Sequence, residues 1–332
     1  MKKRLTRVAA YILVAVACTS VILYAVRARS QCLTPREREG KAQYTFLVCG
    51  LDKASRSTDV ILLASVNTEK GGISILQIPR DTFVNPVSSG LGITRVNAVY
   101  GAEYARADGE DGRERRAMEG LCRFVSGALS VEIDRYVLMD TDAFVSIIDA
   151  VGGVEYDVPF DMDYDDPFQG LSIHLKAGRQ TLCGASAEQL IRYRSGYATG
   201  DLGRVSAREG FLHEVFTQVK EKMSVGSAVR IAAGLIGSVI TNVSPTELAY
   251  FASALYKADD VNIKTISGSA VQNPKTGAWI YYALNRRAAL DDINEYITPV
   301  GAEIPLADFD KNAVFADDPL GENPYISKYY YS

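Results

Sequence analysis

The feature that most constrains the fold of this chain is a series of short apolar segments with aspartates or arginines at or near their ends. The segments Tyr44–Cys49, Asp59–Val66 and Gly72–Ile78 are rich in β-branched residues and are separated by turn-forming residues. This pattern predicts three strands, the last two paired as a hairpin. Asp52 follows the first strand and Pro79-Arg80-Asp81 follows the third, so we expect charged side chains at the strand ends.

The rest of the chain alternates between helical and extended patterns, which is typical of a layered α/β domain. The expected helices begin at Val96 and then cover Arg113–Leu129, Asp142–Val151, Ala185–Leu190, a stretch from Gly203 to about Met223, Ser227–Ile240, a stretch opened by Ser244-Pro245-Thr246-Glu247, and Arg287–Ile297. The expected strands are Ile133–Met139, Val154–Val158, Leu171–Leu175, Val261–Ile266 and Trp279–Tyr282, with an acidic loop around Asp161, Asp163, Asp165 and Asp166.

A hydrophobic N-terminal run predicts a membrane anchor. Residues 8–26 carry no charged side chain, and a helix of this length would span about 28 Å, close to the hydrocarbon thickness of a bilayer. A cleaved signal peptide is the alternative, because Val26-Arg27-Ala28 resembles a cleavage site, but the apolar core of a signal peptide is usually only about 7–15 residues long. The basic residues that precede the run favour a cytoplasmic N-terminus; they are Lys2, Lys3, Arg4 and Arg7.

These patterns divide the chain into five segments. Residues 1–7 are a cytoplasmic tail, 8–26 a transmembrane helix, 27–42 a polar linker, 43–300 an extracytoplasmic domain, and 301–332 a C-terminal tail without clear periodicity. Hydrophobic residues make up 47% of the chain and charged residues 23%, so the domain can bury a large core.

The charge balance and the cysteine and histidine content argue against two kinds of binding partner, nucleic acid and zinc. Residues 1–30 carry six basic and no acidic side chains, so the formal charge of −4 for the chain leaves −10 for the remainder. This acidic balance argues against nucleic acid, which needs a basic surface. The chain has no CxxC motif and only two histidines, which argues against zinc. Cys122 and Cys183 are conceivable disulfide partners in an oxidising exterior, and free buried thiols are the alternative.

Two aspartates predict a divalent cation site. Asp52 ends one strand and Asp59 opens the next, so a short loop holds two carboxylates at one end of the sheet. Carboxylate oxygens are ligands that Mg²⁺ or Mn²⁺ prefers, and two of them leave positions for substrate phosphate. The alternative for each residue alone is an ordinary turn-forming aspartate.

Several arginines lie where they could bind phosphate. Arg80 precedes Asp81 at a strand end, where a surface ion pair is the plainer explanation. Arg192 and Arg194 would point the same way if the backbone there is extended. Arg204 and Arg208 lie one turn apart at the start of a helix, where an anion would offset their unfavourable position in the helix dipole, although Asp201 could do the same.

Eight ordered segments make the chain resemble the LytR–CpsA–Psr family, the extracytoplasmic enzymes of Gram-positive envelopes. The resemblance covers residues 43–225 well and extends weakly to about 298. The segments are Leu47-Val48-Cys49-Gly50-Leu51-Asp52, Asp59-Val60-Ile61-Leu62-Leu63, Ile78-Pro79-Arg80-Asp81-Thr82, Arg95-Val96-Asn97-Ala98-Val99-Tyr100, Asp149-Ala150-Val151-Gly152-Gly153-Val154, Gly178-Arg179-Gln180-Thr181-Leu182-Cys183-Gly184, Arg192-Tyr193-Arg194 and Asp201-Leu202-Gly203-Arg204.

The resemblance implies a central mixed sheet flanked by helices, a hydrophobic tunnel for a polyprenyl chain and a polar mouth that binds its pyrophosphate with Mg²⁺. Members move a glycopolymer, such as a teichoic acid or a capsule polymer, from that lipid onto peptidoglycan. By position, Asp52 and Asp59 match the metal-binding and catalytic aspartates. By position, Arg80, Arg192, Arg194 and Arg204 match the phosphate-binding arginines, and the first three are also expected to be catalytic. Arg95 falls where many members have lysine or arginine, and Arg56 and Arg208 are further candidates for pyrophosphate binding, with Asp81 and Asp201 in support.

The sequence departs from the family pattern at two places. Members commonly read Arg-Ser-Asp where this chain reads Ser57-Thr58-Asp59, so Arg56 is displaced by one position. Members often show Arg-Gln at the third and fourth positions after the arginine that corresponds to Arg204, where this chain has Ala207 and Arg208. Both departures bear on which polymer is carried.

Three functions therefore compete. The first is a membrane-anchored, Mg²⁺-dependent phosphotransferase acting on a polyprenyl-pyrophosphate-linked glycopolymer and peptidoglycan. The second is a pyrophosphatase that loses the same product to water, and the third is a non-catalytic sensor or scaffold that only binds the lipid pyrophosphate. Tunnel walls are the hardest feature to predict, because apolar residues in Leu121–Leu129, Phe144–Val151 and Phe211–Val219 also have ordinary core spacing.

Overall fold

The computed structural model describes residues 40–166, 171–193, 201–222, 239–258, 261–272, 277, 279–312 and 314–315. The predicted anchor at 8–26 lies outside these residues, so the anchor and the five segment boundaries stay predictions. Among the helices that the structure describes, none is both long enough and apolar enough to cross a bilayer.

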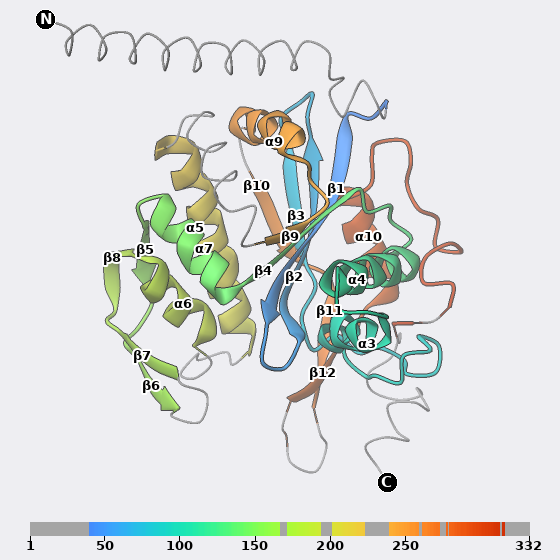
Figure 1. Ribbon diagram of the computed structural model, residues 1–332, viewed down its shortest axis with the longest axis horizontal. Helices are drawn as coiled ribbons and strands as arrows, with labels where there is room; N and C mark the ends of the chain where they lie inside the picture. Colours follow the sequence, from blue (N-terminus) through green and yellow to red (C-terminus); the bar gives the residue numbers. More distant parts are fainter. Residues whose placement is uncertain are drawn as a thin grey trace, which may run out of the picture. The chain divides into compact units, whose positions relative to one another are not determined.

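A six-stranded mixed sheet forms the centre of the domain (Figure 1), in the order β10-β3-β2-β1-β4-β9. The pairs β1–β2, β2–β3 and β4–β9 are antiparallel, whereas β1–β4 and β10–β3 are parallel. This arrangement confirms the predicted hairpin. The strands are β1 Gln43–Asp52, β2 Ser57–Asn67, β3 Ile73–Gln77, β4 Arg135–Asp140, β9 Val239–Thr241 and β10 Val261–Thr265.

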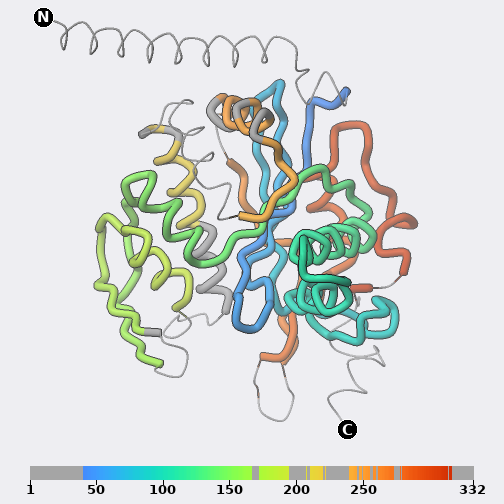
Figure 2. Tube along the Cα trace, viewed as in Figure 1, coloured from blue at the N-terminus to red at the C-terminus, as the bar shows by residue number. Residues whose placement is uncertain are grey.

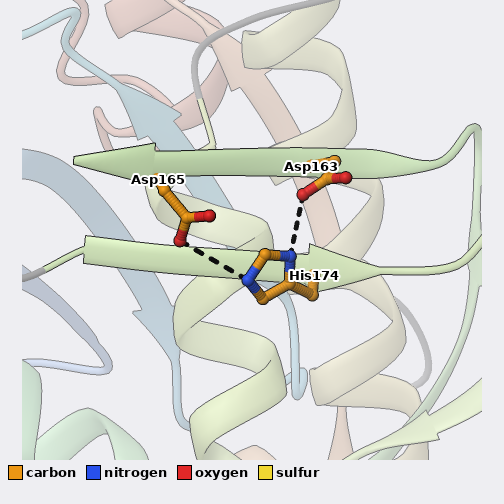
Figure 3. A group of neighbouring side chains, drawn as sticks. All are labelled: Asp163, Asp165 and His174. Carbon is orange, nitrogen blue, oxygen red and sulfur yellow. Dashed lines mark hydrogen bonds and ion pairs between the residues drawn. The ribbon is translucent and has the colours of Figure 1, made fainter.

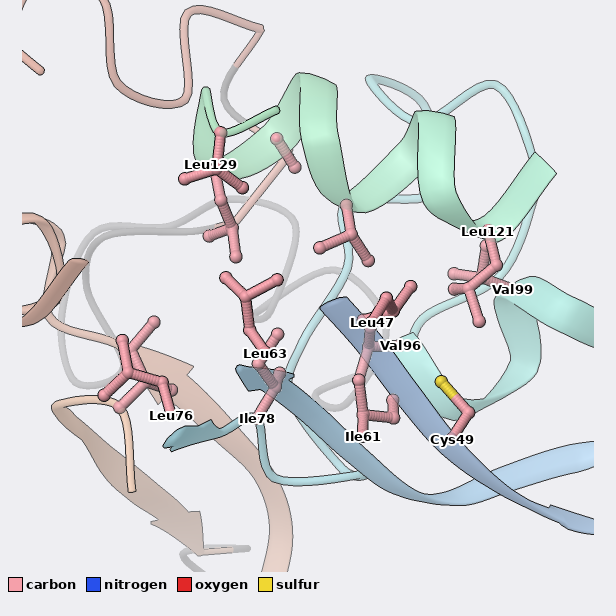
Figure 4. Close-up of a cluster of buried hydrophobic side chains, with 14 of the residues drawn as sticks. Leu47, Cys49, Ile61, Leu63, Leu76, Ile78, Val96, Val99, Leu121 and Leu129 are labelled. Carbon is pink, nitrogen blue, oxygen red and sulfur yellow. The ribbon is translucent and has the colours of Figure 1, made fainter. Parts of the chain in front are cut away.

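One face of this sheet carries the main hydrophobic core (Figure 4). Alternate residues of β1 point to opposite faces, and Leu47 and Cys49 point into this core, where both are fully buried. Three helices pack on the core side: α3 Val99–Arg106, which follows the short 3₁₀ helix Val96–Ala98, α4 Arg113–Leu129 and α10 Arg286–Tyr296. Each fully buried Leu or Ile side chain stabilises the fold by about 1.5–3 kcal/mol.

A second group of elements has a hydrophobic cluster of its own and runs from the middle of the chain (Figure 2). Its helices are α5 Thr141–Ala150, α6 Gly184–Arg192 and α7 Asp201–Lys222. Its strands form two ribbons, β5 Val154–Val158 with β8 Gly178–Leu182, and β6 Met162–Asp166 with β7 Leu171–Leu175. The turn at Gly152 and Gly153, which ends α5, has φ angles of 83° and 81°, a conformation that favours glycine.

Helix α9, Pro245–Lys257, begins where the sequence places a start signal. Ser244 donates from its backbone N–H and its hydroxyl to Glu247, at 2.8 and 2.9 Å, as in a capping box. Glu247 also accepts from Arg135 at 2.8 Å. Burial alone would raise the pKa of Glu247, but the Ser244 and Arg135 hydrogen bonds outweigh it and lower that pKa. The ion pair between Arg135 and Glu247 therefore links β4 to α9.

Several local predictions were wrong. The stretch around Asp163 is strand β6 rather than a loop, because all five of its residues pair with β7 and Met162 is buried. Strand β9 covers Val239–Thr241, where a helix was expected to end at Ile240. Two strands were missed, β8 and β11 Gly268–Gln272, since both are short and polar; β11 pairs with β12 Trp279–Leu284.

The described part of the C-terminal tail packs against the main core. Phe309 and Phe315 are buried there, at 1% and 5% exposure. Asp310 accepts hydrogen bonds from the backbone N–H groups of Val314 and Phe315, at 2.7 and 3.0 Å. Asn85 donates from its backbone N–H to the Val314 carbonyl at 2.9 Å. These residues therefore add to the domain's packing despite their lack of periodicity.

Candidate active site

The turn between β1 and β2 joins the two predicted metal-binding aspartates by hydrogen bonds. Ser55 donates from its hydroxyl to Asp52 at 2.7 Å, and Ser57 donates to Asp59 at 3.3 Å. The two serine hydroxyl oxygens lie 2.7 Å apart. The turn therefore presents two carboxylates and two hydroxyls, all oxygen donors, at one end of the sheet.

The carboxyl group of Asp52 is held in its charged form. Partial burial alone would raise its pKa, but hydrogen bonds from the Ser55 hydroxyl and from the backbone N–H groups of Ala54 and Ser55 outweigh that effect, and the charge of Arg192 adds to it. The net result is a lowered pKa. Asp52 thus stays anionic at neutral pH, and its electrostatic coupling to Arg192 links β1 to α6.

Asp59 begins a chain of ion pairs that leads to Arg95. Arg80 donates from Nη1 to Asp59 at 3.0 Å, and its Nε lies 3.4 Å from a carboxylate oxygen of Asp81. Arg95 approaches the other Asp81 oxygen at 3.4 Å through Nε. The Arg80 side chain is only 18% exposed, so its charge is partly removed from water and is held by two carboxylates.

A cavity of about 650 Å³ opens beside this cluster. Its walls come from the sheet face opposite the main core, including Val48, Gly50 and Val60, and from the helices α5, α6 and α7. Apolar side chains such as Phe144 and Phe211 line it, while Asp52 and Asp59 lie on its wall. An apolar hollow with a few convergent charged groups is the usual form of a small-molecule site.

Helix α6 brings Arg192 to the same cavity. Arg192 is the last residue of that helix, so its backbone is not in the extended strand conformation considered from sequence. Its Nη1 donates to Glu188, one turn earlier, at 2.9 Å, and both side chains line the cavity. Arg194 lies outside the described residues. Asp201, Arg204 and Arg208 belong to α7, but their side chains are not described.

Arg56 has a different contact from that expected. Its guanidinium carbon lies 3.7 Å from the centre of the Tyr104 ring, and Arg113 approaches the same ring at 4.6 Å. Arg56 has a φ angle of 52°, which is strained for a residue with a side chain. A Cβ added to Gly101 would lie 3.0 Å from the Arg56 carbonyl oxygen. The turn is therefore docked tightly on α3, and phosphate binding by Arg56 stays a prediction.

Sequence reasoning missed Asp140, which lines the cavity. Asp140 ends β4 and pairs in parallel register with Leu51, so the ends of β1 and β4 lie together. Burial would raise the pKa of Asp140, but hydrogen bonds from Lys53 and from the Ala143 backbone lower it. The signal that could have identified it is its position as a strand end directly before a helix.

Gln77 is a second missed residue. It lines the cavity with only 6% exposure. Its Oε1 atom has no hydrogen-bond partner within the part of the chain that the structure describes. A buried amide oxygen without a partner is costly, so this atom is available to a donor on a ligand.

The predicted tunnel walls separate into two groups. Leu121 and Leu129 belong to the main core, on the other face of the sheet, so their segment takes the ordinary core role that its spacing also allowed. Phe144 and Phe211 line the cavity. Helical spacing alone does not distinguish the two cases, because both faces of the sheet are covered by amphipathic helices.

The cysteines described do not form disulfides. Cys122 and Cys183 are both free, so the pairing considered from sequence is absent from the structure. Burial raises the pKa of Cys122 to about 12. Cys183 is exposed, and hydrogen bonds from Ser186 lower its pKa.

The residues at the turn fit a hard divalent cation by donor chemistry. Asp52, Ser55, Ser57 and Asp59 offer oxygen atoms alone, and Mg²⁺ prefers oxygen ligands while keeping several waters or substrate phosphates. Two carboxylates are enough for such a site when phosphate supplies the remaining ligands. Metal binding here stays a prediction.

Comparisons with known proteins agree with this architecture. The family model described as the LytR_cpsA_psr family matches residues 20–296. The chain is 30% identical over 195 residues to the cell wall biosynthesis protein LcpA of Corynebacterium glutamicum, covering 55% of this chain and 36% of LcpA. It is 28% identical over 214 residues to the polyisoprenyl-teichoic acid–peptidoglycan teichoic acid transferase TagV of Bacillus subtilis, covering 62% of this chain and 51% of TagV. The aligned part therefore spans between about a third and a half of these relatives' lengths.

Solved structures show the same fold. The crystal structure of Bacillus subtilis TagV matches with a TM-score of 0.61 at 23% identity, covering 78% of this chain and 99% of that chain. The structure of TagT bound to LI-WTA matches with a TM-score of 0.57 at 20% identity, covering 77% of this chain and 90% of that chain. The central mixed sheet flanked by helices is thus shared.

Proposed function

Because the chain belongs to the LytR–CpsA–Psr family, we propose that it is a phosphotransferase that moves an anionic glycopolymer from a polyprenyl-pyrophosphate carrier onto peptidoglycan. The observation that carries the proposal is the hydrogen-bonded series Asp52–Ser55–Ser57–Asp59–Arg80 beside an apolar cavity. Relatives named as teichoic acid–peptidoglycan transferases support the same reaction class.

The cavity and the arginines bind different parts of the proposed lipid substrate. The apolar walls around Phe144 and Phe211 suit a polyprenyl chain. Arg80 and Arg192 suit the diphosphate, because guanidinium groups form paired hydrogen bonds with phosphate oxygens. We extend this role to Arg95, to Arg194 and Arg204, which match the family pattern, and to Arg56 and Arg208, which lie close to matching positions.

The acids serve the acceptor and the metal. Displacement at the phosphorus next to the sugar gives the departing lipid phosphate additional charge, which nearby arginines stabilise. Asp59 or Asp52 accepts the proton of the attacking hydroxyl. Both acids would also hold Mg²⁺ or Mn²⁺, which when bound neutralises phosphate charge. Asp81 and Asp201 keep the neighbouring arginines in position.

The proposed cellular location follows from the N-terminal run. A transmembrane helix at 8–26 would hold the domain on the outer face of the membrane, where both the lipid carrier and peptidoglycan are found. The rest of the chain is then divided as the sequence predicts: a cytoplasmic tail at 1–7, a linker at 27–42, the extracytoplasmic domain at 43–300 and a C-terminal tail at 301–332. A fusion of the first 42 residues to a reporter that folds only outside the cytoplasm tests this topology.

The proposed function is tested by measuring how much glycopolymer an Asp59→Asn variant transfers to peptidoglycan. The purified full chain is incubated with polyprenyl-diphosphate-linked glycopolymer, peptidoglycan and Mg²⁺, and polymer attached to peptidoglycan is measured beside polymer released into solution. We expect attachment to fall at least about a hundredfold, a loss in the range found when one stabilising group is removed from an active site. Asp163→Asn, which removes an exposed carboxylate elsewhere, is the matched control.

Other outcomes would contradict the proposal. Polymer released to water without attachment would identify a pyrophosphatase. Donor that stays bound and unchanged by the wild-type chain would identify a binding protein. Full attachment by Asp59→Asn would show that this carboxylate has no part in the reaction.

A further inference from the structure

The single tryptophan of the chain lies exposed on the hairpin formed by β11 and β12. Trp279 is 50% exposed, although two other β12 residues, Tyr281 and Ala283, are buried at 4% and 1%. A tryptophan left half in water forgoes much of the stabilisation that burial of its ring would give. An exposed aromatic ring of this kind is a frequent element of binding surfaces.

A β-bulge sets the direction of this ring. Val271 pairs with Tyr281 and the next residue, Gln272, pairs with Trp279, so Ile280 is the extra residue. Trp279 is therefore opposite the exposed Gln272 rather than on the side of buried Val271. Bulges re-aim side chains and are frequent near active sites.

The bulge is fixed to the predicted site by Arg95. The Arg95 Nη2 donates to the Ile280 carbonyl at 3.2 Å, while its Nε faces Asp81 at 3.4 Å. Tyr282 donates from its backbone N–H to the Asp81 carbonyl at 2.9 Å. The position of Trp279 is thus set by the same segment that presents Arg80 to Asp59.

Trp279 lies away from the cavity walls. The residues that line the cavity include Asp52, Asp59 and Arg192 but, among the described residues, none of Arg80 to Arg95 and none of β12. In a displacement at phosphorus the attacking and leaving oxygens lie roughly in line. If the lipid chain occupies the cavity, the acceptor hydroxyl approaches from outside the cavity walls, where Arg80, Asp81 and β12 lie.

We propose that Trp279 binds a sugar ring of the acceptor glycan, by packing its indole on the apolar C–H face of a pyranose. This inference rests on the proposed transfer to peptidoglycan. Aromatic side chains give a large apolar contact area at low entropic cost. The exposed amide of Gln272 adds a hydrogen-bonding group for sugar hydroxyls and acetamido groups.

Intrinsic fluorescence tests the contact directly, since Trp279 is the only tryptophan. The purified full chain is titrated with peptide-free glycan strands released from peptidoglycan, with dextran as a control sugar polymer and anionic phospholipid vesicles as a control surface. We expect a saturable shift with the glycan strands and none with dextran. A shift with vesicles and none with glycan strands would overturn the proposal in favour of membrane contact.

Steady-state transfer separates this inference from the function on which it rests. We expect Trp279→Ala to raise the KM for acceptor glycan about tenfold, with kcat and the KM for the lipid donor unchanged. Trp279→Phe should restore most of the acceptor affinity, and Val87→Ala, at another exposed apolar side chain, should change nothing. Normal transfer with an unchanged acceptor KM in Trp279→Ala would overturn the inference and leave the function intact. A glycan-induced shift without any transfer would support the contact and refute the function.

Discussion

Two acidic regions of this protein differ in what surrounds them. At the β1–β2 turn, Asp59 pairs with the partly buried Arg80 beside a cavity. On the outer face of β6 and β7, Asp163 and Asp165 flank His174 at 2.8 and 3.4 Å (Figure 3). All three of these side chains are more than half exposed.

The difference teaches that acids alone do not make a phosphate site. Each ring nitrogen of His174 faces a different carboxylate, so these three exposed side chains already contact one another, and none of them lines the cavity. Ion pairs in water contribute little, about 0–1 kcal/mol. At the β1–β2 turn, partial burial strengthens the electrostatics, and the cavity leaves room for a ligand.

Loss of Arg80 should have the largest effect. Arg80→Ala leaves Asp59 and Asp81 without their shared cation at the edge of the cavity. We expect transfer to fall about 10²–10³-fold, as for removal of one group that stabilises transition-state charge. Arg179→Ala, which removes an exposed guanidinium paired with Glu155, should leave transfer within about twofold. Equal losses in the two variants would erase the contrast between the regions.

Removal of divalent cation should come next in size. We expect a chelator to abolish most of the transfer and added Mg²⁺ to restore it, because the oxygen donors at Asp52 and Asp59 suit that ion. In Asp163→Asn and in His174→Asn the Mg²⁺ concentration for half-maximal transfer should match the wild type. A changed Mg²⁺ concentration for half-maximal transfer in Asp163→Asn or His174→Asn, with no change in Asp52→Asn, would move the proposed metal site to β6 and β7.

A smaller effect is expected at Tyr104, which supports the turn from outside the cavity. Tyr104→Leu removes the ring that holds Arg56 and Arg113, an interaction of about 0.5–2 kcal/mol. We expect kcat to fall about tenfold with little change in the KM for lipid donor, since Asp52 and Asp59 lose their fixed spacing. Tyr104→Phe keeps the ring and should behave as wild type. Unchanged kcat in Tyr104→Leu would show that the stack does not position the acids.

The smallest effect is expected on the stability of the fold at acidic pH. The folded-state pKa of Asp52 lies below its unfolded value of about 3.8, so its stabilising contribution is present above that value and is lost as pH falls through the folded pKa. The stability measured by thermal unfolding should therefore fall less between pH 5 and pH 2 in Asp52→Asn than in wild type. Parallel curves would mean that the Ser55 and Ala54 hydrogen bonds persist with a protonated carboxyl.

Periodic elements could be predicted from sequence because their residues carry the signal locally. The helix Arg113–Leu129 and the strand Val154–Val158 have the bounds predicted for them. Strand β6 was assigned to a loop because its outward acids mask the buried Met162 and the pairing with β7. Strand β11 was missed for a related reason, since its stability comes from pairing with β12 rather than from its own polar residues.

Within the candidate site, the apolar runs indicated that Asp52, Asp59 and Arg80 lie near strand ends. Asp52 does end β1, whereas β2 begins at Ser57, before Asp59, and β3 ends at Gln77, before Arg80. Asp140 also ends a strand, directly before a helix, but only the parallel pairing of β4 with β1 brings it to the cavity. The contact of Arg56 with Tyr104 was also beyond prediction, because the two residues belong to elements that meet only in space.

The sequence by itself determined the α/β class, most of the strands and helices, the family and the placing of charged residues at strand ends, because these depend on local periodicity and on short ordered motifs. Tertiary structure decided which apolar segments line the cavity and which fill the core, and which arginine pairs with which acid. The physical reason is that amphipathic helices cover both faces of the sheet. The spacing of their apolar residues in the sequence is the same whether a helix packs on the core or lines the cavity. Only the packing of α6 beside the sheet brings Arg192 to the cavity that Asp52 and Asp59 also line.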